Sequence, residues 1–567
     1  MAQKLTSTQV LLNEYIKKEY AENPQYQNEG NFFEFFAAAQ VLKERDLSDE
    51  EIEAGICGTA QDGGCDSCYL FIDEILINDD TPLDQFKRNV NIDFYIIQAK
   101  NNTSFNETVF DKWKTTCSNL LDMDNDINSF RDRYNYKVRH VFEMFRNARM
   151  SLVRKSPKVR MFFCYVTKGT SIHPNVEAQS VELKKLVKES CSDAVVSIDF
   201  IGSEKIWGLV NKIINNEFQL TLSENPVMSP SSKVFVALVK LRDYYKFMIN
   251  ENQELTRHIF EANVRDYQGK VAVNKDIQES LETQNEENFW WLNNGATIIA
   301  SDAKIAFGKT LIINDPEIVN GLQTSTEIFN YFKKHPTRLE NDDREILVRI
   351  IVPESEASRD RIIFATNNQT PIQKSSLRAT DVIHRHIESY FKNRELYYDR
   401  RKNFYKNNNK KSSQIVSLPF LSQCLISVLM KRPNDARARP STLLKDDQTY
   451  NNLYGSDQLE LYYNIAVVGK RVEAVLKKAE SYSITQISDI KFYVLFTVFA
   501  KILKRTSITG NEVVDVLLDD ITEDFIIQSA NMVFEIYQKL GGDDRVAKSQ
   551  ELITELIKDL QIEFNFN

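Results

Sequence analysis

The sequence predicts an α/β N-terminal domain with a mixed sheet, an α+β middle domain and an all-α C-terminal region. Three observations predict this order. Apolar runs of strand length alternate with helical stretches in the first third of the chain, a segment rich in Ser, Pro and Asn follows at 222–232, and long amphipathic segments dominate the last third. We therefore expect domains at 1–220, 230–412 and 413–567.

The N-terminal elements can be assigned in order from their residue patterns. Two helices are expected within 7–46, because Phe32, Phe35, Phe36 and Ala39 recur at helical spacing. A Gly-rich turn at 62–66 then begins a strand. The remaining elements expected are strands at 68–72 and 92–100, a helical stretch at 105–155, a strand at 159–167, a helix at 176–190, a strand at 194–201 and a helix at 203–215.

Composition and charge exclude several classes of protein. The 567 residues are 42% apolar, enough for several cores, and the formal net charge of −9 excludes a wholly basic nucleic-acid coat. The N-terminus has no apolar stretch typical of a secretory signal, and the most apolar run, 492–500, is too short to cross a bilayer. Seven cysteines in 567 residues are an odd and sparse set, which favours reduced thiols over a disulfide framework. We expect a cytoplasmic protein without a membrane partner.

Three polar residues are predicted to meet where two strands end. Alternate residues of a strand share a face, so Gln98 and Lys100 point the same way. If the strand that follows Asp66 pairs with this one, a carboxylate, an amide and an ammonium converge. Oxygen donors of this kind suit Mg²⁺, and a lysine beside the ion can orient an attacking water.

Asp66 followed by Gln98-Ala99-Lys100, between an N-terminal helix and a mixed sheet, resembles the PD-(D/E)xK nuclease superfamily in the Mrr-type variant that has Gln in place of the acidic residue. The resemblance implies a nuclease-like domain in which Asp66 and Gln98 bind the metal and Lys100 is the catalytic lysine. It also implies Glu34, on the preceding helix, as a further acidic ligand. The proline that often precedes the Asp is absent, with Cys65 in its place.

A simpler interpretation of these residues stays open. An Asp after Gly-Gly is commonly a turn residue, and a strand that ends in Gln-x-Lys is commonly a solvated strand end.

The stretch 131–160 contains ten basic residues and two acidic ones, a local charge that would attract a polyanion despite the net negative charge. We expect Arg133, Lys137, Arg146 and Arg149 to contact nucleic acid. The alternative is a solvated helix face that the acidic C-terminal third neutralises.

Four Asn-rich and Gln-rich motifs mark the middle domain. They lie at 263–269, 289–300, 318–325 and 365–372, and in this order they resemble the AIPR family, the abortive infection phage resistance proteins, over about 230–400. The resemblance implies bacterial antiviral defence. The polar cleft expected from these motifs comprises Arg265, Asn293, Asn294, Asn320, Gln323, Asn367 and Gln369. The alternative is that these side chains cap helices and fix turns.

The last two motifs are also similar, more distantly, to those of DGQHR-type, ParB-like proteins. Asn320, Thr324 and Ser325 stand where that group has Asp, His and Arg. Because these replacements remove the ionisable groups, only a polar binding cleft is expected.

A second basic stretch, 374–411, has eleven basic residues, four acidic ones and interleaved Tyr and Phe, which suits backbone contacts with base stacking. We expect Arg400, Arg401 and Lys402 to bind nucleic acid, with DNA favoured over RNA.

The sequence thus predicts a Mg²⁺- or Mn²⁺-dependent endonuclease of bacterial anti-phage defence, restrained or directed by its AIPR and helical domains. The alternatives are a non-catalytic DNA-binding regulator with a degenerate nuclease fold and a phage-sensing scaffold. A phage-derived trigger and a homo-oligomer are open as partners.

Overall fold

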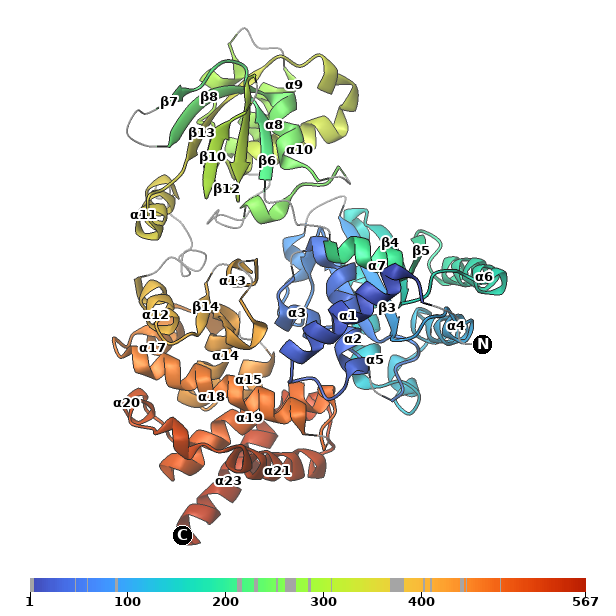
Figure 1. Ribbon diagram of the computed structural model, residues 1–567, viewed down its shortest axis with the longest axis vertical. Coiled ribbons are helices and arrows are strands. Elements are labelled where there is room, and N and C mark those ends of the chain that lie inside the picture. The colour runs from blue at the N-terminus through green and yellow to red at the C-terminus, as the bar shows by residue number, and fades with distance from the viewer. Residues whose placement is uncertain are drawn as a thin grey trace. The chain divides into compact units, whose positions relative to one another are not determined.

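The computed structural model describes residues 5–45, 47–58, 60–86, 90–211, 217–228, 233–250, 253–260, 272–283, 287–306, 308–367, 382–400, 403–407, 410–438, 443–444, 446–479 and 481–566. Contacts divide the chain into two compact units, one made of Met1–Lys212 with Val382–Asn567 and the other of Ile213–Asp381. Sheets lie in the N-terminal and middle parts and the C-terminal part is helical (Figure 1), so the predicted mixed fold class is confirmed at this level. None of the described helices is long and apolar enough to cross a membrane.

The N-terminal part of the first unit contains a five-stranded mixed sheet in the order β2-β1-β3-β4-β5. β1 pairs antiparallel with β3, whereas β3, β4 and β5 are parallel. The strands are β1 (Ser67–Ile72), β2 (Ile75–Leu76), β3 (Asn91–Lys100), β4 (Lys158–Thr167) and β5 (Val195–Ile201). The long buried runs of β3 and β4 fit central strands that are covered on both faces.

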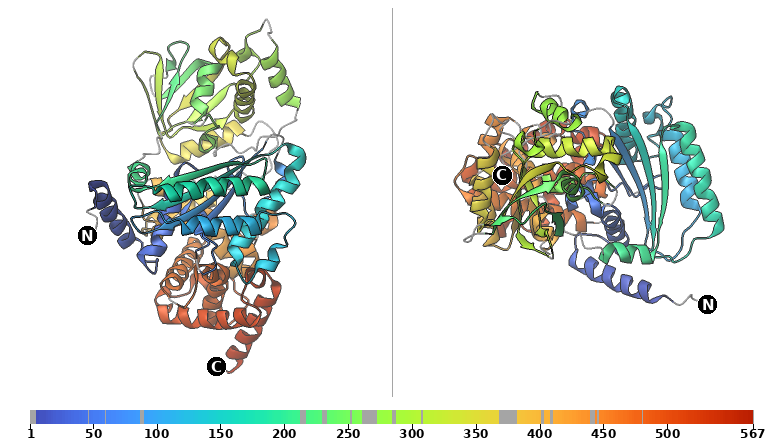
Figure 2. Two further views of the ribbon diagram at one scale, coloured as in Figure 1. Left: turned by 90° about the vertical axis from the view of Figure 1, so that its right-hand side faces the viewer. Right: turned by 90° about the horizontal axis from the view of Figure 1, so that it is seen from above.

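Helices cover both faces of this sheet (Figure 2). Because neighbouring side chains of a strand alternate, Ile96 packs under α4, α5 and α6, while Ile97 packs under α1, α2 and α7. The helices are α1 (Ser7–Glu22), α2 (Glu29–Val41), α3 (Asp49–Ala54), α4 (Thr108–Leu120), α5 (Tyr136–Leu152), α6 (Pro174–Ser190) and α7 (Ser203–Asn211). The stretch expected as helical at 105–155 holds two α-helices, α4 and α5, and two short 3₁₀ helices at Ile127–Phe130 and Val153–Lys155.

The second unit is built on a five-stranded mixed sheet, β12-β9-β13-β8-β7, and a three-stranded sheet, β10-β11-β6. Its strands are β6 (Glu217–Thr221), β7 (Val227–Met228), β8 (Val234–Lys240), β9 (Ala296–Ile299), β10 (Asp302–Ile305), β11 (Thr310–Asn314), β12 (Glu317–Asn320) and β13 (Glu345–Ile351). Its helices are α8 (Leu241–Met248), α9 (Ala272–Glu282), α10 (Leu322–Lys334) and α11 (Glu356–Asn367).

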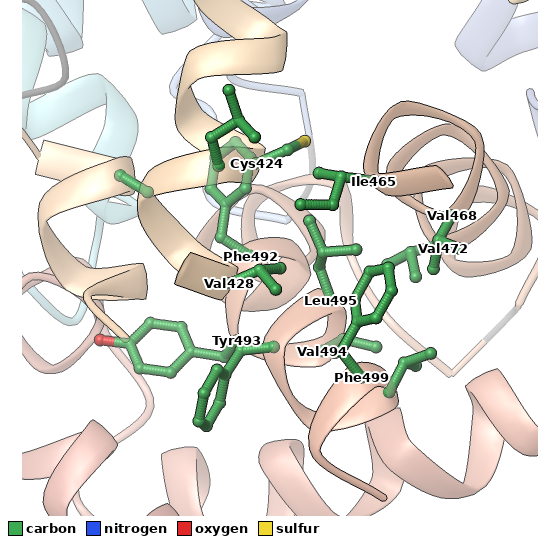
Figure 3. Close-up of a cluster of buried hydrophobic side chains, with 14 of the residues drawn as sticks. Cys424, Val428, Ile465, Val468, Val472, Phe492, Tyr493, Val494, Leu495 and Phe499 are labelled. Atoms are coloured by element: carbon green, nitrogen blue, oxygen red, sulfur yellow. The ribbon is translucent and has the colours of Figure 1, made fainter. Parts of the chain in front are cut away.

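The C-terminal helices share a large apolar core with one another. Figure 3 shows Val428 of α14, Val468 of α18 and Val494 and Phe499 of α19 meeting in it. The helices are α12 (Val382–Lys392), α13 (Phe404–Asn407), α14 (Leu418–Leu429), α15 (Pro433–Ala438), α17 (Asp447–Tyr454), α18 (Leu459–Lys478), α19 (Ile484–Leu503), α20 (Gly510–Val514), α21 (Glu523–Lys539), α22 (Asp544–Ala547) and α23 (Gln550–Phe566).

This division differs from the domain boundaries expected near residues 220 and 412. Ile387 and Phe391 of α12 are buried in the same core as Val416 and Phe420, so this segment belongs with the C-terminal helices. The C-terminal region also includes a short parallel pair of strands, β14 (Tyr397–Asp399) and β15 (Ile415–Ser417), and is helical otherwise within the described residues.

Candidate active site and binding residues

Asp66, Gln98 and Lys100 meet at one end of the N-terminal sheet. The register of β1 and β3 sets Ser67 opposite Ile97, so the residue before β1 lies beside Gln98. Lys100 is the last residue of β3, two positions further on and on the same face. The structure therefore brings together the three residues that the sequence predicts to converge.

The Asp66 carboxylate is buried and receives several contacts on one oxygen. Lys100 Nζ lies 3.6 Å from Asp66 Oδ2, and the Ala99 backbone N–H donates to the same oxygen at 2.8 Å. Gln98 Nε2 also donates to Oδ2. The Lys100 side chain is 40% exposed, so it is partly open to solvent while it contacts the buried Asp66.

A glycine turn directs the chain into this site. Gly63 and Gly64 both have positive φ angles, and the Gly64 N–H donates to Asp62 Oδ1 at 2.8 Å. Two buried side chains of α4 hold the turn in place. Trp113 Nε1 donates to the Gly64 carbonyl at 2.6 Å, and Thr116 Oγ1 donates to the Gly63 carbonyl at 2.8 Å. The Gly-Gly sequence is therefore needed for the path of the chain.

Glu34 reaches the same place from α2. The backbone N–H groups of Cys57 and Gly58 donate to the Asp66 carbonyl at 2.8 and 3.0 Å. The Glu34 carboxylate lies directly against Gly58, where an added Cβ would collide with Oε2. The carboxylate that the resemblance implied as a further ligand is thus part of the cluster.

The acids that lie close together at this end of the sheet raise one another's pKa values. Burial, together with the negative charge of Asp66, raises the pKa of Glu34 to about 8. Burial and the charge of Asp62 raise the pKa of Asp66 to about 6, although Lys100 opposes the shift. Asp62 is an acidic neighbour of the site that the sequence pattern did not indicate, because it stands in the Gly-rich turn, where an Asp is commonly a turn residue.

The donor set fits a hard divalent cation, with one adjustment. Two carboxylates and an amide supply oxygen atoms, and a cation would relieve the repulsion between the acids. Gln98, however, turns its amide nitrogen toward Asp66, so a ligand role needs half a turn of the amide. Within the described residues, no three His, Cys, Asp or Glu side chains are arranged to hold a metal by themselves.

Two of the basic residues expected at a nucleic-acid surface are placed very differently. Arg133 is exposed, with its guanidinium 5.8 Å from the centre of the Tyr134 ring. Lys137 instead donates to the Ile56 carbonyl at 2.8 Å, and burial lowers the pKa of its ammonium. Lys137 therefore serves a packing contact inside the first unit.

Arg146 and Arg149 also bind groups of the chain itself. Arg146 donates to the backbone carbonyl of Asn125 at 2.9 Å. Arg149 donates to Asp193 Oδ1 at 2.7 Å and to Cys191 Sγ at 3.0 Å. The Asp193 carboxylate offsets the charge of Arg149, whereas the Asn125 carbonyl holds the Arg146 guanidinium without neutralising it.

Arg400 does not lie on a surface, contrary to the expectation of a nucleic-acid contact. It is 6% exposed, and its Nε donates to Glu388 Oε2 at 2.5 Å. Its charge is satisfied by an internal ion pair, which explains why a basic run fails to indicate a surface. Arg401 and Lys402 lie outside the described residues.

Three of the Asn-rich motifs of the second unit meet at one end of its larger sheet. Asn320 lies opposite Thr297 in the pairing of β12 with β9, and its Nδ2 donates to the Thr366 carbonyl at 3.1 Å. Gly321 packs against Gly295, since a Cβ at 321 would lie 2.9 Å from the Gly295 carbonyl. The Thr297 hydroxyl is buried there without a hydrogen-bond partner.

The remaining polar-cleft residues are only partly placed. Asn293 Nδ2 donates to the Phe289 carbonyl at 2.8 Å, Asn294 is exposed, and Gln323 is partly buried in the first turn of α10. Asn367 is the last residue of α11, and its side chain is not described. Arg265 and Gln369 lie outside the described residues.

Replacing Gly295 by alanine should lower the free energy of unfolding by about 2 to 3 kcal/mol. The residue has a positive φ of 73°, and an added Cβ would collide with the Leu347 carbonyl. Gly308 is a matched control, because its φ is 77° but an added Cβ meets nothing, so Gly308→Ala should cost only about 1 kcal/mol. Urea unfolding followed by tryptophan fluorescence measures both, and equal losses would contradict this packing.

The fold and these residues define a protein with an α/β domain that carries an acidic, lysine-bearing strand-end site, a mixed-sheet domain with Asn-Gly motifs, and a helical region. Residues 260–557 match the AIPR protein family. Because the match covers more than half of the 567 residues, the chain belongs to the AIPR family. No curated protein and no solved structure shows significant similarity to the chain.

The family match extends further than the resemblance in the sequence suggested. It begins in the second unit and continues through the C-terminal helices as far as α23, whereas the motifs placed it at about 230–400. The helical region is therefore part of what defines the family.

Proposed function

We propose that this AIPR protein is a metal-dependent nuclease that hydrolyses phosphodiester bonds, DNA favoured, in abortive-infection defence against phage. The observation that carries the proposal is the contact between Lys100 Nζ and Asp66 Oδ2 at 3.6 Å, at the end of a mixed sheet that follows α2, the helix that carries Glu34. This is the arrangement of residues that the PD-(D/E)xK resemblance implies. Family membership supports the defence role.

The chain's own residues would divide the work. Asp66, Glu34 and, after rotation of its amide, Gln98 would hold Mg²⁺ or Mn²⁺, and the bound ion would polarise the scissile phosphate and lower the pKa of a bound water. Lys100 offers a compact, partly exposed ammonium that can orient the attacking water and offset charge on the phosphate. Asp66 in turn fixes the position of that ammonium.

The direct test uses the purified full-length chain. We expect it to shorten labelled duplex DNA in the presence of Mg²⁺ or Mn²⁺ and to leave it intact in EDTA. Single-stranded DNA and RNA in parallel reactions identify the preferred substrate. Binding of DNA without any shortening, with either ion, would contradict a nuclease.

One observation favours a second candidate, a nucleic-acid-binding protein without catalysis. The Asp66 Oδ2 atom already accepts bonds from the Gln98 amide and the Ala99 N–H and contacts Lys100, so this oxygen has partners without a cation. Such a protein would bind DNA equally well in EDTA and in Mg²⁺.

Stabilisation by Mn²⁺ should grow as the pH rises from about 6 to about 8. The pKa values of Asp66 and Glu34 are raised on folding, so between the ordinary carboxyl pKa and about 8 the folded chain binds more protons than the unfolded one. Without metal, the free energy of unfolding therefore falls as the pH rises through this window. A divalent cation binds the ionised carboxylates and reverses the loss.

Thermal unfolding with and without Mn²⁺ across this pH range measures the effect. Glu34→Gln should flatten the upper part of the pH dependence, because the group with the pKa of about 8 is removed. A stabilisation by Mn²⁺ that is independent of pH would contradict ligation by these two carboxylates.

A further inference from the structure

A row of acids on the N-terminal part faces lysines of the C-terminal region within the first unit. In each pair the acid comes from the N-terminal part and the lysine from the C-terminal one. The pairs are Asp49–Lys406 at 2.6 Å, Glu50–Lys470 at 3.9 Å, Glu53–Lys477 at 2.7 Å, and Asp79–Lys548. Three of the four acids lie on α3, the short helix that leads into the strand-end site.

Glu53–Lys477 is the most completely formed of these pairs. Lys477 Nζ contacts both carboxylate oxygens of Glu53, at 2.7 and 2.8 Å, and Tyr26 Oη donates to Glu53 Oε1 at 2.8 Å. The two charged side chains are only 17% and 21% exposed. A charge-assisted contact shielded from water in this way is stronger than a surface ion pair.

Glu473, on the same helix, also holds the ammonium of Lys477 in place. Glu473 lies one turn earlier on α18 and is buried, with the ammonium groups of Lys477 and Lys470 at 3.8 and 3.9 Å and that of Lys491 of α19 at 2.9 Å. The position of Lys477 is therefore set by the helical core, and α3 meets a rigid partner.

The backbone after α3 connects Glu53 to the site over five residues. The Gly55 carbonyl accepts from the Cys68 N–H at 2.9 Å, and Ile56 pairs with Ser67. The N–H groups of Cys57 and Gly58 then donate to the Asp66 carbonyl, as described above. Segment 55–58 is thus held by α3 at one end and contacts Asp66 and Glu34 at the other.

We propose that the Glu53–Lys477 ion pair is a positioning contact, through which the C-terminal helices hold segment 55–58 in place and so set the cation affinity of the Asp66–Glu34 site. The proposal rests on the proposed function, because only a cation-binding site has an affinity to set. A purely structural contact would contribute stability to the whole unit and leave the site unchanged.

The test compares Lys477→Met with Lys478→Met in the full chain. Met keeps the apolar stem and removes the charge, and Lys478 is the adjacent lysine, half exposed and 3.4 Å from the exposed Glu523. For each variant, calorimetric titration measures the Kd for Mn²⁺, and hydrogen exchange measures the protection of the Cys57 and Gly58 amides.

We expect Lys477→Met to weaken Mn²⁺ binding by about tenfold and to speed exchange at these two amides by about tenfold. Lys478→Met should change neither by more than about twofold. Lys477→Arg, which can still form two bonds to the Glu53 carboxylate, should restore both values. If Lys477→Met does not fold, Glu53→Gln takes its place. It removes the contact from the other side, and we expect the same changes of about tenfold in Mn²⁺ binding and in amide exchange.

The outcomes separate this proposal from the nuclease proposal. If the parent binds Mn²⁺ and Lys477→Met alters neither its affinity nor the two amides, the positioning role is overturned and the nuclease proposal stands. Faster exchange spread evenly over the first unit would likewise reduce the pair to a structural contact. If the parent binds no Mn²⁺, the proposed function fails and this proposal fails with it.

Discussion

Replacing Asp66 by asparagine is expected to lower the rate of Mg²⁺-dependent DNA cleavage by about a thousandfold or more. Asparagine keeps the shape of the side chain but removes the negative charge that a cation needs. Lys100→Met should have a comparable effect, because it removes the ammonium 3.6 Å from Asp66 Oδ2. Initial rates on a labelled duplex, measured at saturating Mg²⁺, give the comparison.

Unfolding can be separated from lost chemistry. The pKa of Asp66 is raised to about 6 by burial and by Asp62, so at pH 8 its ionised form is a cost to the metal-free fold. Asp66→Asn should therefore leave the melting temperature without metal at pH 8 unchanged or higher. Asp111→Asn, an exposed acid of α4 that pairs with Lys114, is the control and should cleave like the parent. Parental rates in Asp66→Asn would end the nuclease proposal.

The strand-end cluster could be predicted from the sequence because it depends on local rules. Alternation along a strand puts Gln98 and Lys100 on one face whatever the rest of the fold, and strands close in the chain are usually neighbours in the sheet, as β1 and β3 are although β2 lies between them in sequence. The position of Asp66 beside Gln98 then depends only on the register of β1 and β3, in which Ser67 lies opposite Ile97.

The basic stretches could not be interpreted in the same way, because a charge is exposed only if no distant partner satisfies it. Lys137 binds the Ile56 carbonyl, 81 residues away in sequence, and Arg149 binds Asp193, 44 residues away. Arg400 is buried against Glu388. Local counts of basic residues carry no information about such partners, so a run of positive charge overestimates the surface field.

The same reason explains why the grouping of the chain into units was not predictable. The core that α12 joins is completed by residues 25 or more positions later, such as Val416 and Phe420. The contact between Lys406 and Asp49 joins the two chain segments that make up the first unit. The change to long amphipathic segments after residue 412 does not mark the division at Val382, because long-range packing decides which segments fold together.

Glu473 is a further residue whose role the sequence hides, and Glu473→Gln should lower the free energy of unfolding by about 3 to 5 kcal/mol. From sequence spacing alone, Glu473 is expected to form an i, i+4 ion pair with Lys477 on the surface of a helix. In the structure it is buried among the ammonium groups of Lys470, Lys477 and Lys491. Burial alone would raise the pKa of Glu473, but these lysines hold that pKa well below its usual value.

Urea unfolding at neutral pH measures this loss, and Glu523→Gln is the matched control, because Glu523 is exposed and should change stability by less than about 0.5 kcal/mol. A depressed carboxyl pKa contributes stability above its unfolded value and loses it as the pH falls. The difference between parent and Glu473→Gln should therefore shrink in acid. If the two glutamates cost the same at neutral pH, the three lysines are stabilised by solvent rather than by Glu473, and α18 does not supply the rigid partner that α3 requires.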